Sequence, residues 1–193
     1  MKKVKLVIAV LFTIMLVVAC DNEKQIETKK TSEVFQLQRP EDTNLGFWIT
    51  EQVGNLSDRG YREIYGWMGA REFYGEGYEP IIDEEGNEHK PEYYVTYLVS
   101  AYPDYADGGQ YITRIEITDV EVTVYGLTVN SSFEEFDKTF REMGYEIEVH
   151  DVGSYIHHSA TKDGISFTLG YGDEVKPTFT IRAEVSNREG LQY

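Results

Sequence analysis

A single cysteine, Cys20, limits how this chain of 193 residues can be held together. It directly follows an apolar run, Leu6–Ala19, and the sequence has no second thiol with which it could form a disulfide. Cysteine nucleophiles and thiolate metal sites elsewhere in the chain are excluded for the same reason. The rest of the chain therefore has to fold by burying apolar side chains, and their spacing indicates the architecture.

The first twenty residues have the order of a sorting signal. Three lysines precede an apolar run of 14 residues, which is shorter than the ~20 residues that a membrane-spanning helix needs. The segment Leu16–Val17–Val18–Ala19–Cys20 resembles the lipobox of bacterial lipoproteins. This resemblance implies cleavage before Cys20, a diacylglyceryl thioether on its sulfur and an anchor on the extracytoplasmic face of the cell membrane. Asp21 resembles the retention signal for the inner membrane in cells that have two membranes.

The charge of the chain argues against one class of partner. Without residues 1–20 the chain has 15 basic and 34 acidic residues, a formal charge of −19. This charge repels phosphate backbones and anionic headgroups, so the sequence predicts no nucleic-acid binding. Two explanations of the negative charge stay open: a cationic partner, or simply solubility outside the cell.

Polarity divides the rest of the chain into two parts. Residues 21–44 are polar and charged, which predicts a flexible tether. Residues 45–193 have continuing apolar periodicity, which predicts a single α+β domain with an antiparallel sheet and one or two packed helices. The spacing predicts a helix over Ser132–Met143, with a capping box formed by Ser131 and Glu134. A second helix is predicted over Asp58–Phe73.

Alternation of apolar and polar residues indicates several strands. A Lys162–Asp163–Gly164 turn predicts a hairpin between two of them. The predicted strands are Tyr93–Tyr102, Tyr111–Thr118, Tyr145–Val149, Tyr155–Ala160, Ile165–Tyr171 and Phe179–Val185.

Two parts of the domain resemble each other. Arg114–Asp119 and Arg182–Asn187 share an Arg-x-Glu pattern, and Gly46-Phe-Trp-Ile and Gly126-Leu-Thr-Val each precede a predicted helix. We expect tandem repeats over 46–119 and 126–187; the alternative is ordinary strands with residue types in common.

A family resemblance accompanies this pattern. Gly126-Leu-Thr-Val-Asn-Ser-Ser resembles the lead into the helix of the β-lactamase-inhibitor-protein-like fold, although Met143–Gly144–Tyr145 stands where that family has Leu-Gly-x-Pro. The resemblance implies tandem units of a helix followed by an antiparallel sheet. The chain also resembles uncharacterised lipoproteins of Gram-positive bacteria, a resemblance that implies no activity.

No complete catalytic motif is present in the sequence. Ser159-Ala-Thr-Lys162 has Ser-x-x-Lys spacing but runs into the predicted hairpin turn and lacks a Lys-Thr-Gly partner. His157 and His158 are neighbours on a predicted strand, so their side chains point to opposite faces and cannot chelate one ion. We therefore expect no catalytic residues, metal or cofactor.

The sequence favours a binding role for one face of the sheet. Tyrosine and arginine are common at interfaces, and strand alternation predicts an interaction face with Tyr94, Leu98, Tyr102, Ile112 and Arg114. The expected function is a non-catalytic, membrane-anchored module that binds a protein or another envelope component. The alternative is a small solute-binding or hydrolytic envelope lipoprotein.

Overall fold

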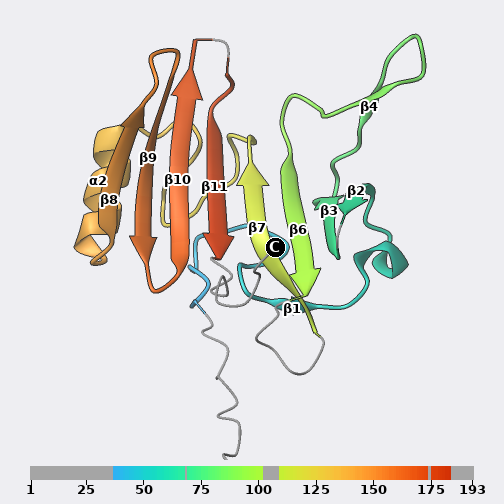
Figure 1. The fold of residues 1–193 in the computed structure, drawn as a ribbon, viewed down its shortest axis with the longest axis horizontal. Helices are drawn as coiled ribbons and strands as arrows, with labels where there is room; N and C mark the ends of the chain where they lie inside the picture. The colour runs from blue at the N-terminus through green and yellow to red at the C-terminus, as the bar shows by residue number, and fades with distance from the viewer. Residues whose placement is uncertain (1–36, 68, 102–108, 174, 184–193) are drawn as a thin grey trace, which may run out of the picture. The chain divides into compact units, whose positions relative to one another are not determined.

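A computed structural model describes residues 37–67, 69–101, 109–173 and 175–183, and the fold is given for these residues. They form an antiparallel sheet of nine strands, of which eight lie in the order β2-β3-β6-β7-β11-β10-β9-β8 while β1 pairs with β7 (Figure 1). The strands are β1 (Gln52–Val53), β2 (Glu63–Trp67), β3 (Ala70–Tyr74), β6 (Val95–Ala101), β7 (Gln110–Ile117), β8 (Glu146–Asp151), β9 (Tyr155–Lys162), β10 (Ile165–Gly172) and β11 (Thr178–Ala183).

Four further elements complete the described fold. A short 3-10 helix, η1 (Leu56–Arg59), precedes β2, and α2 (Phe133–Glu142) precedes β8. The strands β4 (Ile81–Ile82) and β5 (Glu88–His89) form a separate two-stranded sheet. The predicted class, an antiparallel sheet with a packed helix, is confirmed. No helix in these ranges is long and apolar enough to cross a membrane.

The helix α2 forms where the sequence predicts it, with its cap shifted by one residue. Ser132, and not Ser131, is the N-cap: its hydroxyl accepts a hydrogen bond from the Glu135 amide, and the Glu135 carboxylate accepts one from the Ser132 amide. The predicted pair Ser131 and Glu134 is therefore wrong by one position. Phe136 and Phe140 lie on the buried side of α2 at 0% exposure.

The helix predicted over Asp58–Phe73 is wrong. Among the described residues of this segment only those of η1 are helical, and β2 and β3 follow as an antiparallel pair, with Gly69 at φ +83° directly before β3. A bulge in β2 between Glu63 and Tyr65 interrupts the two-residue alternation that would have indicated a strand. The helix was predicted because the sequence spacing of Tyr61, Ile64, Tyr65 and Met68 fits one face of a helix.

The predicted orientation of Ile112 is also wrong. Leu98 pairs with Arg114 and Val99 pairs with Ile112, so Thr113 is an extra residue in β7. This bulge reverses the alternation in the first part of β7 and turns Ile112 toward the core, where it is 0% exposed. Ile112 therefore cannot belong to an exposed interaction face.

The hairpin predicted between β9 and β10 is confirmed. Lys162 pairs with Ile165, which leaves Asp163 and Gly164 as a two-residue turn. Both residues have positive φ, +51° and +75°, as the primed turns of tight hairpins require. Glycine adopts this conformation without strain, and aspartate tolerates it better than most residues.

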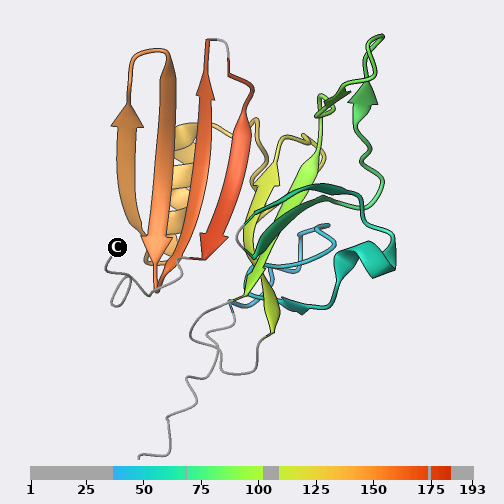
Figure 2. The ribbon, with the colours of Figure 1, turned by 45° about the vertical axis from the view of Figure 1, so that its right-hand side comes forward.

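The core lies on one face of the sheet. In the first half the sheet is covered by the buried residues Leu45, Phe47 and Ile49 and by Leu56 of η1; in the second half it is covered by α2 (Figure 2). Aromatic rings fill the space beneath α2: the ring centroid of Phe140 lies 4.6 Å from that of Phe167 and 4.7 Å from that of Phe136.

The segment before this core is held by hydrogen bonds. The Thr123 hydroxyl donates to the Asp42 carbonyl, the Gly126 amide donates to the Asp42 carboxylate, and the Asn44 side chain donates to the Glu121 carbonyl. Residues 37–44 thus contact the domain, although the sequence assigns them to the tether. Residues 21–36 of that tether, like Cys20, lie outside the described residues.

Replacement of Phe140 by alanine should lower the free energy of unfolding by about 3–5 kcal/mol, because it leaves a cavity among packed aromatic rings. The exposed Lys138 of the same helix provides the control, and Lys138→Ala should change stability by less than about 0.5 kcal/mol. Urea unfolding followed by circular dichroism measures both. Equal midpoints for the two variants would contradict this account of the core.

Candidate interaction face

The surface of the sheet opposite α2 has outward side chains that are mostly polar. We call this surface the open face. Cross-strand pairing places Leu98 beside Arg114 and Arg114 beside Arg182, and the next row contains Thr96, Glu116 and Thr180. The open face therefore extends continuously across β6, β7 and β11, and the register carries it on to β10 and β9.

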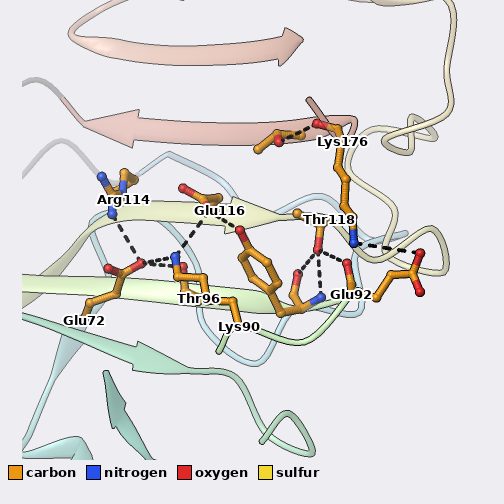
Figure 3. A network of polar contacts seen from close by, with 10 residues as sticks. Glu72, Lys90, Glu92, Thr96, Arg114, Glu116, Thr118 and Lys176 are labelled. Carbon is orange, nitrogen blue, oxygen red and sulfur yellow. Dashed lines mark hydrogen bonds and ion pairs between the residues drawn. The ribbon is translucent and has the colours of Figure 1, made fainter. Parts of the chain in front are cut away.

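A buried carboxylate organises the first half of the open face. Glu72 of β3 is 2% exposed, and its Oε1 accepts a 2.8 Å hydrogen bond from the Thr96 hydroxyl (Figure 3). Arg114 Nη2 and Lys90 Nζ lie 3.3 and 3.4 Å from the same oxygen. A carboxylate this buried requires such partners, because an unpaired charge away from water is costly. Arg114 therefore has a structural role.

A second carboxylate extends this network. Glu116 accepts a 2.6 Å hydrogen bond from the Tyr94 hydroxyl and lies 3.6 Å from Lys90 Nζ. The Lys90 ammonium also lies 5.0 Å from the centroid of the Tyr94 ring. Burial, together with the hydrogen bond to Glu116, raises the pKa of Tyr94, so this phenol stays protonated and donates. The segment with Lys90 thus covers this part of the sheet.

The predicted interaction residues have different positions. Tyr94, Leu98 and Arg114 lie on the open face and are partly exposed, as predicted. Ile112 is buried in the core, and Tyr102 lies outside the described residues. Tyr94 and Arg114 are committed to the Glu72 and Glu116 network, so they lie at the boundary of the accessible surface.

The sequence prediction missed Glu72, Lys90 and Thr96. Their contacts join positions 18 to 42 residues apart, which no local pattern reveals. Glu72 also fell in the helix wrongly predicted over Asp58–Phe73. Glu72, Phe73 and Tyr74 are all buried, so β3 has no alternation of burial that could have indicated this role for Glu72.

Short hydroxyl side chains line the second half of the open face. Ser159, Thr168 and Thr180 form one row across β9, β10 and β11, and the hydroxyls of Ser159 and Thr168 are 3.0 Å apart. Each of the hydroxyl residues is partly exposed. We call this set the hydroxyl strip: Ser159, Thr161, Ser166, Thr168, Thr178 and Thr180.

Aromatic side chains border one end of the hydroxyl strip. Tyr155 lies across Gly170, where an added methyl group would be 2.1 Å from the tyrosine hydroxyl oxygen, so any larger residue would displace the Tyr155 ring. The His157 ring stacks on that of His150 at 4.7 Å, and its Nδ1 is buried without a hydrogen-bond partner. Burial, and then the charges of His150 and His158, lower the pKa of His157.

His158 lies on the opposite face from His157, as the alternation predicts. Its Nδ1 is 2.7 Å from the Asp137 carboxylate of α2, and its ring stacks on Phe133 with centroids 4.0 Å apart. These contacts join α2 to β9. Within the described ranges, no group of three or more His, Cys, Asp and Glu side chains could hold a metal ion.

Two hollows lie away from the open face. One, of about 340 Å³, is lined by Leu37–Glu41 and by Tyr125, Tyr145 and Lys162. The Lys162 ammonium there already donates to the Met143 carbonyl. The other, of about 320 Å³, is lined by Arg59–Arg62 and Gly75–Glu79. Arg62 there is paired with Glu88.

Comparison of the chain with protein-family models, with curated proteins and with solved structures finds no match.

Replacement of Arg114 by methionine should lower the free energy of unfolding by about 1–3 kcal/mol, because Glu72 loses a charged donor. In Glu72→Gln the same change should cost at least about 0.5 kcal/mol less, since the two side chains interact. Urea unfolding of the four proteins in this cycle provides the measurement. Arg182, the exposed residue opposite Arg114, is the control, and its replacement by methionine should be nearly neutral. Additive effects of Arg114 and Glu72 would contradict the network.

The lowered pKa of His157 predicts a loss of stability in mild acid. The unfolded chain takes up this proton near pH 6.5, before the folded chain does, so the stabilisation is complete above that pH and is lost as pH falls below it. Between pH 7.5 and 5.5 the free energy of unfolding should fall less in His157→Gln than in the original chain. Thr161→Gln, at a residue of the same strand that does not titrate, should leave the original pH dependence in place.

Proposed function

We propose that this chain is a lipid-anchored extracytoplasmic lipoprotein that acts as a non-catalytic binding module. The observation that carries the binding role is the hydroxyl strip, a partly exposed surface on β9, β10 and β11 that faces away from the core. The partner in this proposal is a protein or another envelope component, and Arg182 extends the contact toward Tyr94 and Arg114.

The chemistry of the hydroxyl strip supports binding over catalysis. Serine and threonine hydroxyls donate and accept hydrogen bonds without a fixed charge, so they suit a polar partner surface. Nucleophilic catalysis would need a base within hydrogen-bond reach of such a hydroxyl. Ser159 instead shares its hydrogen bond with the hydroxyl of Thr168.

The anchor rests on the sequence of the first twenty residues. Cys20 follows the apolar run and supplies the thiol to which a lipid would be attached. A diacylglyceryl group and a further acyl chain would give stable anchoring where one chain gives marginal binding.

The strand order supports a duplicated fold as part of the proposal. Each half of the sheet has four strands that follow the chain order from the edge of the sheet to its middle: β2-β3-β6-β7 in one half and β8-β9-β10-β11 in the other. The two halves meet where β7 pairs with β11. Arg114 and Arg182, the corresponding residues of the two similar segments, are paired directly across this junction. The first half has η1 where the second has α2, so we propose tandem units that have diverged, similar to the β-lactamase-inhibitor-protein-like fold.

Photo-crosslinking from the open face tests the binding role. A photoreactive residue at Thr168 of the full-length chain, expressed in its own host, should give a defined adduct, whereas the same residue at Lys138 on α2 should not. The adduct should disappear in Thr180→Arg/Arg182→Glu, which replaces no residue of the Glu72 network although both positions pair with it. Adduct formation that is unaffected by these substitutions would overturn the proposed face.

The anchor has an independent test. In Cys20→Ala the protein should leave the membrane fraction, because the thioether cannot form. Ser32→Ala, in the segment after Cys20, provides the matched control and should stay with the membrane. Fractionation and immunoblotting measure the distribution, and equal membrane fractions for both variants would refute the anchor while leaving the binding test intact.

A further inference from the structure

Half of the exposed large apolar side chains among the described residues, four of eight, lie at one end of the sheet. Val152, Val175 and Val120 lie in the connections β8–β9, β10–β11 and β7–α2, and they are 72%, 46% and 39% exposed. Tyr93, immediately before β6, is 50% exposed. Valine is a poor turn residue, since its branched side chain favours extended backbone, so turn chemistry does not explain these three valines.

Hydrogen bonds and an ion pair connect these residues into one surface. The Asp173 amide donates to the Ser154 carbonyl at 3.2 Å, which joins the connection with Val175 to that with Val152. Lys176 Nζ lies 3.8 Å from Glu92, which joins the Val175 connection to Tyr93 (Figure 3).

Thr118 connects Val120 to the same end of the sheet. Its amide donates to the Tyr94 carbonyl at 2.9 Å, which brings Val120 to the same end. We call Val152, Val175, Tyr93 and Val120 the distal surface.

Carboxylates flank the distal surface. Asp151 precedes Val152, Glu92 precedes Tyr93, and Asp119 and Glu121 flank Val120. All of these carboxylates except that of Asp119 belong to exposed residues. Asp119 accepts a 2.7 Å hydrogen bond from the Tyr78 hydroxyl, which fixes the loop that carries Val120. The surface therefore combines apolar side chains with negative charge, and its complement is a surface that combines apolar side chains with positive charge.

The chain enters the domain at the other end of the sheet. Residues Leu37–Glu41 line a hollow with Lys162 and Asp163, at the turn where β9 ends, while β9 begins beside Val152. The eight residues of β9 span about 23 Å at roughly 3.3 Å per residue. The distal surface is thus about one strand length from the point where the chain enters.

We propose that the distal surface docks a protein partner whose contact surface combines lysine or arginine with apolar side chains. Burial of the three valines and Tyr93 gives the complex its apolar contact, and the flanking carboxylates select a basic partner and repel a second copy of this acidic chain. The orientation of this surface away from the membrane rests on the proposed anchor, whereas the docking itself does not.

A defined peptide tests the chemistry of the surface. The full chain with Cys20→Ala, in buffer without vesicles, is titrated with a fluorescent peptide of alternating lysine and leucine and, separately, of alternating glutamate and leucine. The lysine peptide should bind, and Val120→Ser/Val152→Ser/Val175→Ser should weaken it at least about tenfold by removing apolar contact. Val149→Ser/Tyr65→Ser, at exposed apolar residues in the edge strands, should not change the affinity.

Each other outcome decides against the proposal. If the two peptides bind with equal affinity, or if the two sets of variants bind the lysine peptide with equal affinity, the chemistry proposed for the distal surface is wrong. Light scattering that detects a dimer lost in the triple variant would assign the surface to a second copy. Vesicle binding by Cys20→Ala that is lost on adding the three serines would assign it to lipid. Thr180→Arg/Arg182→Glu should leave peptide binding unchanged, so failure of the proposed open face and failure of the distal surface are distinguishable.

Discussion

The pairing of β7 with β11 holds the two halves of the sheet together. Four residue pairs make this junction, and their inward side chains, Ile115, Ile117, Phe179 and Ile181, are at most 1% exposed. These side chains connect the core beneath α2 with the core beneath residues 45–56. The same pairing aligns the open face, because it sets Glu116 beside Thr180 and Arg114 beside Arg182. A shift of one residue would exchange the faces of one half.

The sequence predicted the elements whose signals are local. The helix α2 has a phenylalanine stripe and a cap within one turn, and the β9–β10 hairpin has its Asp-Gly turn at the centre. The errors occur where pairing decides the backbone. The bulge at Thr113 inserts one residue of β7 between the pairs Leu98–Arg114 and Val99–Ile112, and Ile112 beyond it is buried. Likewise, the donors of Glu72 come from positions 18 and 42 residues away in the sequence.

The open face shows why residue type alone is a weak guide to a binding surface. Tyr94 and Arg114 are of the types that interfaces favour, yet both are engaged with carboxylates of their own sheet. The hydroxyl strip is less conspicuous in sequence because serine and threonine are common in strands. It emerges only when the register brings β9, β10 and β11 side by side. Its candidate role could therefore not be read from any one strand.

The placement of the distal surface has a mechanical consequence. The strands run between that surface and the end where the chain enters, so a pull applied between the two would act along the strand direction. Inter-strand hydrogen bonds lie across this direction, and a force along the strands loads a whole ladder at once in shear. Peeling an edge strand would break the bonds one after another. The direction of the sheet thus favours resistance to tension applied between the distal surface and the point where the chain enters.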